Sequence, residues 1–168
     1  MIFRTSNIWM DNTKEYLLGS SIRNIGSHEI VTWLGTDIQG ADSAERVIKQ
    51  FHEAAKLENP PYGGYLGSGN AHHWGMFKGV VYIHCEYDEE MKVAMTYEQA
   101  VGALENYKQF LLSTRTDPAN PPATFDIEYL LDGEAAADLY FNKLGGRIGF
   151  TLDERKVMAK EQKKRGKK

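Results

Sequence analysis

The sequence predicts a single α+β domain: an antiparallel sheet of about five or six strands, two main helices packed on one face, and a C-terminal helical extension. Short segments rich in β-branched and aromatic residues are separated by turns too short for the crossovers that parallel strands need. Two longer segments carry apolar residues at helical spacing. The 168 residues suffice for one domain. Its core is expected to contain Val47, Ile48, Phe51, Val81, Ile83, Val101, Leu104 and Leu111.

The first third of the chain is expected to form strands. Residues 3–10 and 15–18 contain short apolar stretches. Residues 28–34 are rich in β-branched and aromatic side chains and lie between Gly26 and Gly35. Because the turns are short, an antiparallel meander is the simplest connection between these strands.

A helix is predicted next. Asp42 and Glu45 have the spacing of a capping box, in which two side chains satisfy free N–H groups of the first turn. Pro60 and Pro61 end the segment, because proline cannot continue the helical hydrogen bonds. The apolar stripe of this helix consists of Ala44, Val47, Ile48, Phe51 and Ala55.

A β-hairpin is predicted between the two main helices. A Gly-, Pro- and Tyr-rich loop over residues 60–72 precedes it. Its arms are residues 74–77 and 80–87, with Lys78-Gly79 as the turn. Acidic residues 88–90 then form a second turn, which leads to a further short strand.

The second main helix has the clearest signals. Thr96 and Gln99 form a capping box, and the helix is expected to end near Ser113. Its stripe consists of Tyr97, Val101, Leu104, Tyr107 and Leu111, with Lys108 as the polar exception.

The composition of residues 115–122 is that of a linker. It divides the chain into an α+β core domain over residues 1–114, an extension over residues 115–150 packed on the core, and a basic, partly helical tail over residues 151–168.

Within the extension, alternating apolar and acidic residues over 125–131 predict an edge strand. Residues 134–143 predict a short helix stopped by Gly145. Thr151 and Glu154 have the spacing of another cap, which would begin the basic helix of the tail.

A cytoplasmic protein that does not bind membranes is expected. No apolar run approaches the roughly 20 residues that a membrane helix needs. The N-terminus lacks the basic start and apolar stretch of a signal peptide. The single cysteine, Cys85, excludes an internal disulfide and is compatible with a reducing compartment.

The charge is unevenly distributed along the chain. Residues 1–150 carry 12 Lys and Arg against 20 Asp and Glu, a net of −8, whereas residues 151–168 carry 8 against 3, a net of +5. An acidic body repels phosphates, so it disfavours nucleic acid and favours a basic protein as the partner. The alternative, that the acidity only maintains solubility, stays open.

The histidines and the cysteine do not predict a metal site. His72, His73, His84 and Cys85 are residue types that bind zinc, but no CxxC or HExxH motif occurs. If residues 80–87 form a strand, His84 and Cys85 point to opposite faces of the sheet. No metal or other cofactor is therefore expected.

No catalytic motif is complete either. Gly64, Gly67 and Gly69 lack the GK[ST] ending of a phosphate-binding loop, and no helix is expected directly after them. Ser68 lacks the spacing and the strand–turn–helix context of a nucleophile elbow. No catalytic residue is assigned, and the chain is expected not to be an enzyme.

Two sets of acidic residues with aromatic neighbours are the candidate binding sites. Like charges packed closely cost stability, so such a set can mark a surface that faces basic residues. Aromatic side chains supply the contact area that an interface needs. A simple solvated face is the alternative. The candidate partner-binding residues are Glu86, Tyr87, Asp88, Glu89, Glu90, Asp126, Glu128, Tyr129 and Asp132, with Tyr62 and Tyr65 from the glycine-rich loop.

The order of several short segments resembles a known group of proteins. Residues 27–33 (Ser-His-Glu-Ile-Val-Thr-Trp) precede a helix with Val47 and Ala54-Ala55, a hairpin ending in acidic residues, and a helix with residues 106–110 (Asn-Tyr-Lys-Gln-Phe). This layout, over about residues 15–112, resembles the YacL family of small bacterial proteins and the immunity proteins of contact-dependent growth inhibition and related polymorphic toxin systems. The resemblance implies a cytoplasmic inhibitor that binds one cognate toxin, often over its active site. Toxins of this kind that attack nucleic acid tend to be basic.

The leading hypothesis is an immunity protein that binds and neutralises a cognate bacterial toxin domain, such as a nuclease, through an acidic, aromatic-flanked surface. One alternative is a small-molecule enzyme that uses the glycine-rich loop and His72 or His73. A deep pocket beside residues 63–73, lined by carboxylates with perturbed pKa values, would favour this alternative. The other is a nucleic-acid-binding regulator that uses the basic tail.

Overall fold

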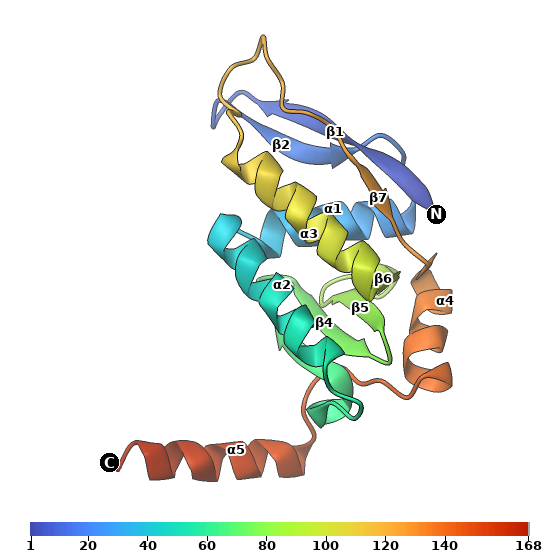
Figure 1. Ribbon diagram of the computed structural model, residues 1–168, viewed down its shortest axis with the longest axis vertical. Coiled ribbons are helices and arrows are strands. Elements are labelled where there is room, and N and C mark those ends of the chain that lie inside the picture. Colours follow the sequence, from blue (N-terminus) through green and yellow to red (C-terminus); the bar gives the residue numbers. More distant parts are fainter. Residues whose placement is uncertain (168) are drawn as a thin grey trace.

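The computed structural model describes residues 1–167, whose eight strands form two antiparallel sheets (Figure 1). The strand orders are β2-β1-β7 and β3-β4-β5-β6-β8. The α+β class, the antiparallel pairing and the C-terminal helix are confirmed. After β2 the chain leaves the smaller sheet and passes through two helices before it forms the larger one.

The smaller sheet pairs the two N-terminal strands with a strand from the last third of the chain. β1 (Ile2–Met10) and β2 (Glu15–Ser20) pair as an antiparallel hairpin. β7 (Asp126–Glu128) pairs with the other side of β1, so the edge strand predicted here is confirmed. Arg4 donates two hydrogen bonds to the carboxylate of Asp126, at 2.9 and 3.0 Å.

Residues 28–34 lie in helix α1 (Ile25–Asp37), so the prediction of a strand there is wrong. The helix begins with a capping box that the sequence reading missed. Asn24 Oδ1 accepts from the Ser27 N–H at 2.8 Å, and Ser27 Oγ accepts from the Asn24 N–H at 3.4 Å. Burial outweighs the β-propensity of this segment. The buried apolar side chains recur at helical spacing and are Ile30, Trp33 and Leu34, followed by Ile38 at the C-cap.

Both main helices of the sequence prediction are confirmed as α2 (Ala41–Ala55) and α3 (Tyr97–Leu112). The predicted capping box of α3 is present, since Thr96 and Gln99 each accept the other's backbone N–H, at 2.9 and 3.1 Å. The predicted cap at Asp42 is wrong. α2 already begins at residue 41, and its N-cap is a glycine with no side chain to accept a hydrogen bond.

The larger sheet contains the predicted hairpin. β4 (His72–Phe77) and β5 (Val80–Cys85) pair across a two-residue turn, and β6 (Lys92–Thr96) continues the meander. β3 (Tyr65–Ser68) lies in the segment predicted as a loop and forms one edge. β8 (Leu131–Asp132) forms the other edge. Residues 126–132 thus contribute a strand to each sheet.

Helices cover both faces of the larger sheet (Figure 1). α1, α2 and α3 pack on one face, so α1 adds a third helix to the two that the sequence predicts there. The other face is covered by α4 (Gly133–Ala137) and the π-helical turn η2 (Asp138–Lys143) that continues it, which confirms the predicted short helix.

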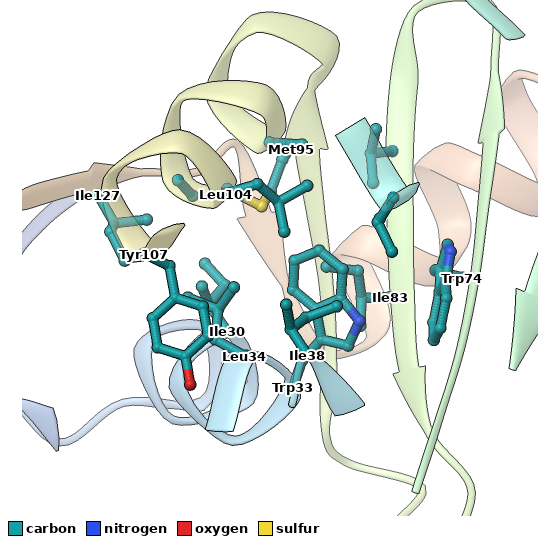
Figure 2. Close-up of a cluster of buried hydrophobic side chains, with 14 of the residues drawn as sticks. Ile30, Trp33, Leu34, Ile38, Trp74, Ile83, Met95, Leu104, Tyr107 and Ile127 are labelled. Carbon is teal, nitrogen blue, oxygen red and sulfur yellow. The ribbon is translucent and has the colours of Figure 1, made fainter. Parts of the chain in front are cut away.

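The main core lies between the three helices and the sheet, where Trp33 packs edge-on against Trp74 with 6.0 Å between ring centroids (Figure 2). A smaller cluster lies on the opposite face, where Tyr82 stacks on Tyr140. Of the predicted core residues, Val101 and Leu111 are only partly buried. Those confirmed as buried are Val47, Ile48, Phe51, Val81, Ile83 and Leu104.

The tail forms α5 (Leu152–Arg165), which projects from the body and has no buried residue (Figure 1). Its predicted cap is confirmed, because Thr151 and Glu154 each accept the other's backbone N–H at 3.2 Å. Among residues 1–167, no helix is both long and apolar enough to cross a membrane.

Two glycines of α1 allow a matched test of its packing. A Cβ on Gly26 would lie 2.4 Å from the buried Tyr129 ring, whereas a Cβ on Gly35 would meet nothing within 4 Å. We expect Gly26→Ala to lower the free energy of unfolding by at least about 1 kcal/mol, because the ring or the helix must shift. Gly35→Ala should raise it by about 0.5–1 kcal/mol through helix propensity. Urea denaturation measures both, and equal effects would contradict this arrangement of α1.

Candidate functional site

The first acidic set forms the turn between β5 and β6, which we call the acidic turn (residues 86–90). All five residues are exposed, and Tyr87 reaches 78% exposure. Backbone hydrogen bonds fix the turn, since Glu86 N donates to Ala71 O at 2.8 Å and Met91 N donates to Asp88 O at 3.1 Å. The Asp88 carboxylate also accepts from the Glu90 N–H at 3.0 Å. The turn therefore presents its acids on an ordered backbone.

The carboxylates of the acidic turn are mostly unneutralised. Glu86 Oε1 lies 2.7 Å from His73 Nε2. Within residues 1–167, the carboxylates of Asp88, Glu89 and Glu90 take part in no ion pair. Three adjacent negative groups thus face solvent without an internal counter-charge.

The second acidic set consists of Asp126, Glu128 and Asp132, and most of it has partners within the protein. Asp126 pairs with Arg4, and Asp132 Oδ2 accepts from the Gly26 N–H at 2.9 Å, where it satisfies the first turn of α1. Glu128 is exposed on β7. Tyr129 is only 1% exposed, so its ring lies in the core and offers no surface to a partner. Most of this set therefore contributes to the fold itself.

The two tyrosines of the glycine-rich loop pack on Phe150, each with 5.0 Å between ring centroids. Tyr62 is partly exposed, whereas Tyr65 is buried. The Tyr65 hydroxyl lies 2.8 Å from His73 Nδ1. Because His73 Nε2 contacts Glu86, a polar chain runs from Tyr65 through His73 to the acidic turn.

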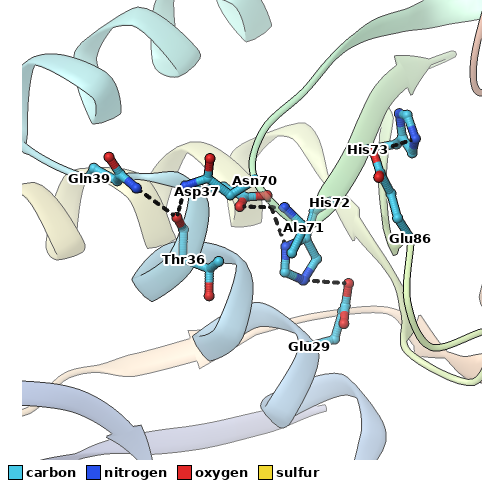
Figure 3. Close-up of polar contacts among 9 residues, drawn as sticks. All are labelled: Glu29, Thr36, Asp37, Gln39, Asn70, Ala71, His72, His73 and Glu86. Atoms are coloured by element: carbon cyan, nitrogen blue, oxygen red, sulfur yellow. Dashed lines mark hydrogen bonds and ion pairs between the residues drawn. The ribbon is translucent and has the colours of Figure 1, made fainter.

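A buried ionic cluster lies on the opposite face of β4 from His73 (Figure 3). His72 Nδ1 lies 2.9 Å from Asp37 Oδ2, and His72 Nε2 lies 3.3 Å from Glu29 Oε1. All three side chains have no solvent exposure. Asp37 Oδ1 also accepts from the Ala71 N–H at 3.1 Å. We call Glu29, Asp37 and His72 the buried cluster, and it joins α1 to the start of β4.

The electrostatics of the buried cluster favour a protonated histidine. Burial alone would lower the pKa of His72, but contacts with Asp37 and Glu29 outweigh it and raise this pKa to about 9. Burial raises the pKa of the Glu29 carboxyl, and His72 only partly offsets that effect. Within residues 1–167, the Glu29 carboxylate accepts no hydrogen bond, so its principal partner is the imidazolium.

Sequence reasoning named His72 but missed Glu29 and Asp37. A signal was present, because Glu29, Trp33 and Asp37 recur at a spacing of four residues and therefore share one side of a helix. The strand prediction for residues 28–34 hid it. Since His72 is fully buried, it does not contact any ligand in this conformation.

The glycine-rich loop is shaped by close packing. Gly64 has φ +87°, and a Cβ there would lie 2.3 Å from the Met76 carbonyl oxygen. This glycine is therefore explained by the approach of β4 and needs no phosphate ligand. Across residues 1–167, no group of three or more His, Cys, Asp or Glu side chains is arranged to hold a metal ion.

Comparison of the sequence with known protein families and with curated proteins, and of the structure with solved structures, found no match. The resemblance to immunity proteins therefore stays a prediction, and functional inference rests on the geometry.

The buried cluster predicts a loss of stability at alkaline pH. Because the pKa of His72 is about 9 in the fold against 6.5 for an unperturbed histidine, its contribution is complete below pH 6.5 and disappears as the pH rises through 9. The free energy of unfolding should fall by at most about 3 kcal/mol over this interval. Urea denaturation at a series of pH values measures it.

Two variants separate this effect from general alkaline instability. Glu29→Gln removes one negative charge beside His72, so the loss of stability should begin at lower pH. His28→Gln changes an exposed histidine on the same helix and should keep the wild-type pH profile. If Glu29→Gln and the wild type show the same profile, the protonated buried cluster does not exist.

Proposed function

We propose that this chain is an immunity protein that binds and neutralises a bacterial toxin domain with a basic surface. The observation that carries the proposal is the acidic turn, where an exposed tyrosine stands among four acidic side chains on an ordered hairpin end. Its partner is expected to present Lys and Arg side chains to these carboxylates.

The energetics of the acidic turn support a binding role. Three neighbouring carboxylates that form no ion pair within residues 1–167 repel each other, which costs stability in the free protein. A basic partner removes that cost on binding, and charge complementarity also accelerates association. Tyr87 adds an aromatic ring of the kind that contributes strongly to protein interfaces.

The order of the turn adds to this support. Hydrogen bonds of Glu86, Met91 and Glu90 hold the backbone before a partner arrives. A preordered binding segment loses less conformational entropy on association. The hydrogen-bonded backbone of the acidic turn therefore lowers the entropic cost of binding a partner.

The two alternative functions have weaker support. For an enzyme, the groove next to the glycine-rich loop is lined by one carboxylate, Glu53, and His72 lies outside it in the interior. For a nucleic-acid-binding regulator, α5 supplies exposed basic side chains, but the acidic body would repel the same phosphates.

Calorimetric titration against the toxin domain encoded immediately upstream of this chain's gene tests the proposal. We expect tight binding that weakens as salt is added, together with protection of cells that express the toxin. The double variant Glu89→Lys/Glu90→Lys should bind at least about tenfold more weakly, with a smaller salt dependence. Tyr87→Ala should weaken binding by about 10- to 30-fold.

Asp153→Lys/Glu161→Lys is the matched control, because it makes the same charge change on exposed α5 and should leave the affinity nearly unchanged. Wild-type affinity in the double variant would remove the acidic turn from the interface. Absence of both heat and protection with the wild-type chain would end the proposal.

A further inference from the structure

A groove with a volume of about 580 Å³ runs along the outer edge of the larger sheet, between α2 and edge strand β3. This volume lies within the range of roughly 300 to 1,000 Å³ that is typical of small-molecule sites. Leu57 is about half exposed, so the groove leaves apolar surface in water. Its apolar lining consists of Ala54, Leu57, Pro60, Pro61, Tyr65 and Leu66.

The rim of the groove is positively charged although the body of the protein is acidic. Arg46, Lys49 and Lys56 line it, with Glu53 as the one lining carboxylate. The three cations are exposed; Arg46 and Lys49 lie one turn apart on α2, and Lys56 is the residue that caps its C-terminal end. None of them takes part in an ion pair within residues 1–167.

We propose that this groove binds a small amphipathic anion, with an apolar chain along the lining and a carboxylate or phosphate head held by the cations of α2. An apolar chain would cover Leu57 and its neighbours, which gains about 0.8 kcal/mol for each methylene group that it buries. An anionic head would complement the unneutralised rim, whereas a cationic head would be repelled. This site goes beyond the proposed toxin binding, which uses the acidic turn.

The structure also supplies a reporter for occupancy. Gln50 lines the groove, and its Oε1 accepts a hydrogen bond from Trp74 Nε1 at 3.3 Å. Trp74 itself is buried against the core. A ligand that moves the Gln50 side chain therefore changes the surroundings of the Trp74 indole. Binding should be visible in the intrinsic fluorescence of the protein.

Titration of the full chain with decanoate and with decyl phosphate, both below their micelle concentrations, tests the proposal. We expect a saturable change in fluorescence with one or both anions, and the stronger of the two identifies the preferred head group. Decyltrimethylammonium and decanol have the same apolar chain without the negative charge and should bind at least tenfold more weakly. Trp74→Phe should remove the fluorescence change while calorimetry still detects binding.

Variants locate the site. Lys49→Glu/Lys56→Glu should weaken binding of the preferred anion at least tenfold, and Leu57→Asp should weaken it through the apolar chain. These side chains are exposed, so the variants should unfold at the wild-type temperature. Lys160→Glu/Lys163→Glu on α5 is the charge-matched control and should keep wild-type affinity.

Failure to bind either anion would overturn the proposal, as would equal binding of the anionic, neutral and cationic probes. Unchanged affinity in the Lys49→Glu/Lys56→Glu variant would also overturn it. No toxin is present in these titrations, so their outcome is independent of the proposed immunity function.

Discussion

The contacts of the buried His72 side chain with the carboxyl groups of Glu29 and Asp37 join helix α1 to the larger sheet. Glu29 lies in the second turn of α1, Asp37 is the last residue of this helix, and His72 is the first residue of β4. Removal of one member of a buried charged group typically costs about 3–5 kcal/mol, because the others lose their counter-charge without regaining water. The cluster therefore holds α1 against the sheet at a defined position along β4.

The cluster also affects the opposite face of β4, where His73 lies. Consecutive residues of a strand point to opposite faces, so His73 faces away from the helices when His72 faces them. On that side His73 contacts Glu86, the first residue of the acidic turn. The geometry of the proposed binding surface thus depends on a contact in the interior of the protein. Residues that a partner never contacts can therefore still affect binding by moving β4.

The success of the fold prediction followed the strength of the local signals. The capping box of α3 agrees with the structure, and of its predicted apolar stripe Leu104 and Tyr107 are buried. In α1 the local signals conflict, since Ile30 and Val31 favour strands and Gly26 and Gly35 resemble strand boundaries. Those glycines lie inside the helix. Gly26 is explained by a close approach to Tyr129, a contact between residues far apart in sequence that no local pattern reveals.

The candidate site could be predicted only where it is local in sequence. Residues 86–90 are consecutive in a turn, so their exposure followed from the hairpin prediction. For the second acidic set, the sequence could not show which carboxylates have partners within the protein. Arg4 donates to the Asp126 carboxylate, and the Gly26 N–H donates to the Asp132 carboxylate. Each donor lies more than 100 residues from its acceptor in the chain. A count of acidic residues therefore overstates the charge that is available to a partner.

The two exposed surfaces have opposite charge and are connected through one residue. Tyr65 is among the residues that line the groove beside α2, and its hydroxyl contacts His73, which in turn contacts Glu86 of the acidic turn. A basic partner at the acidic turn would compete with His73 for the Glu86 carboxylate. Because Tyr65 is buried and packed on Phe150, its ring has little freedom to follow such a change. We therefore expect a change at the acidic turn to reach His73 but not the groove, so that the two surfaces act independently.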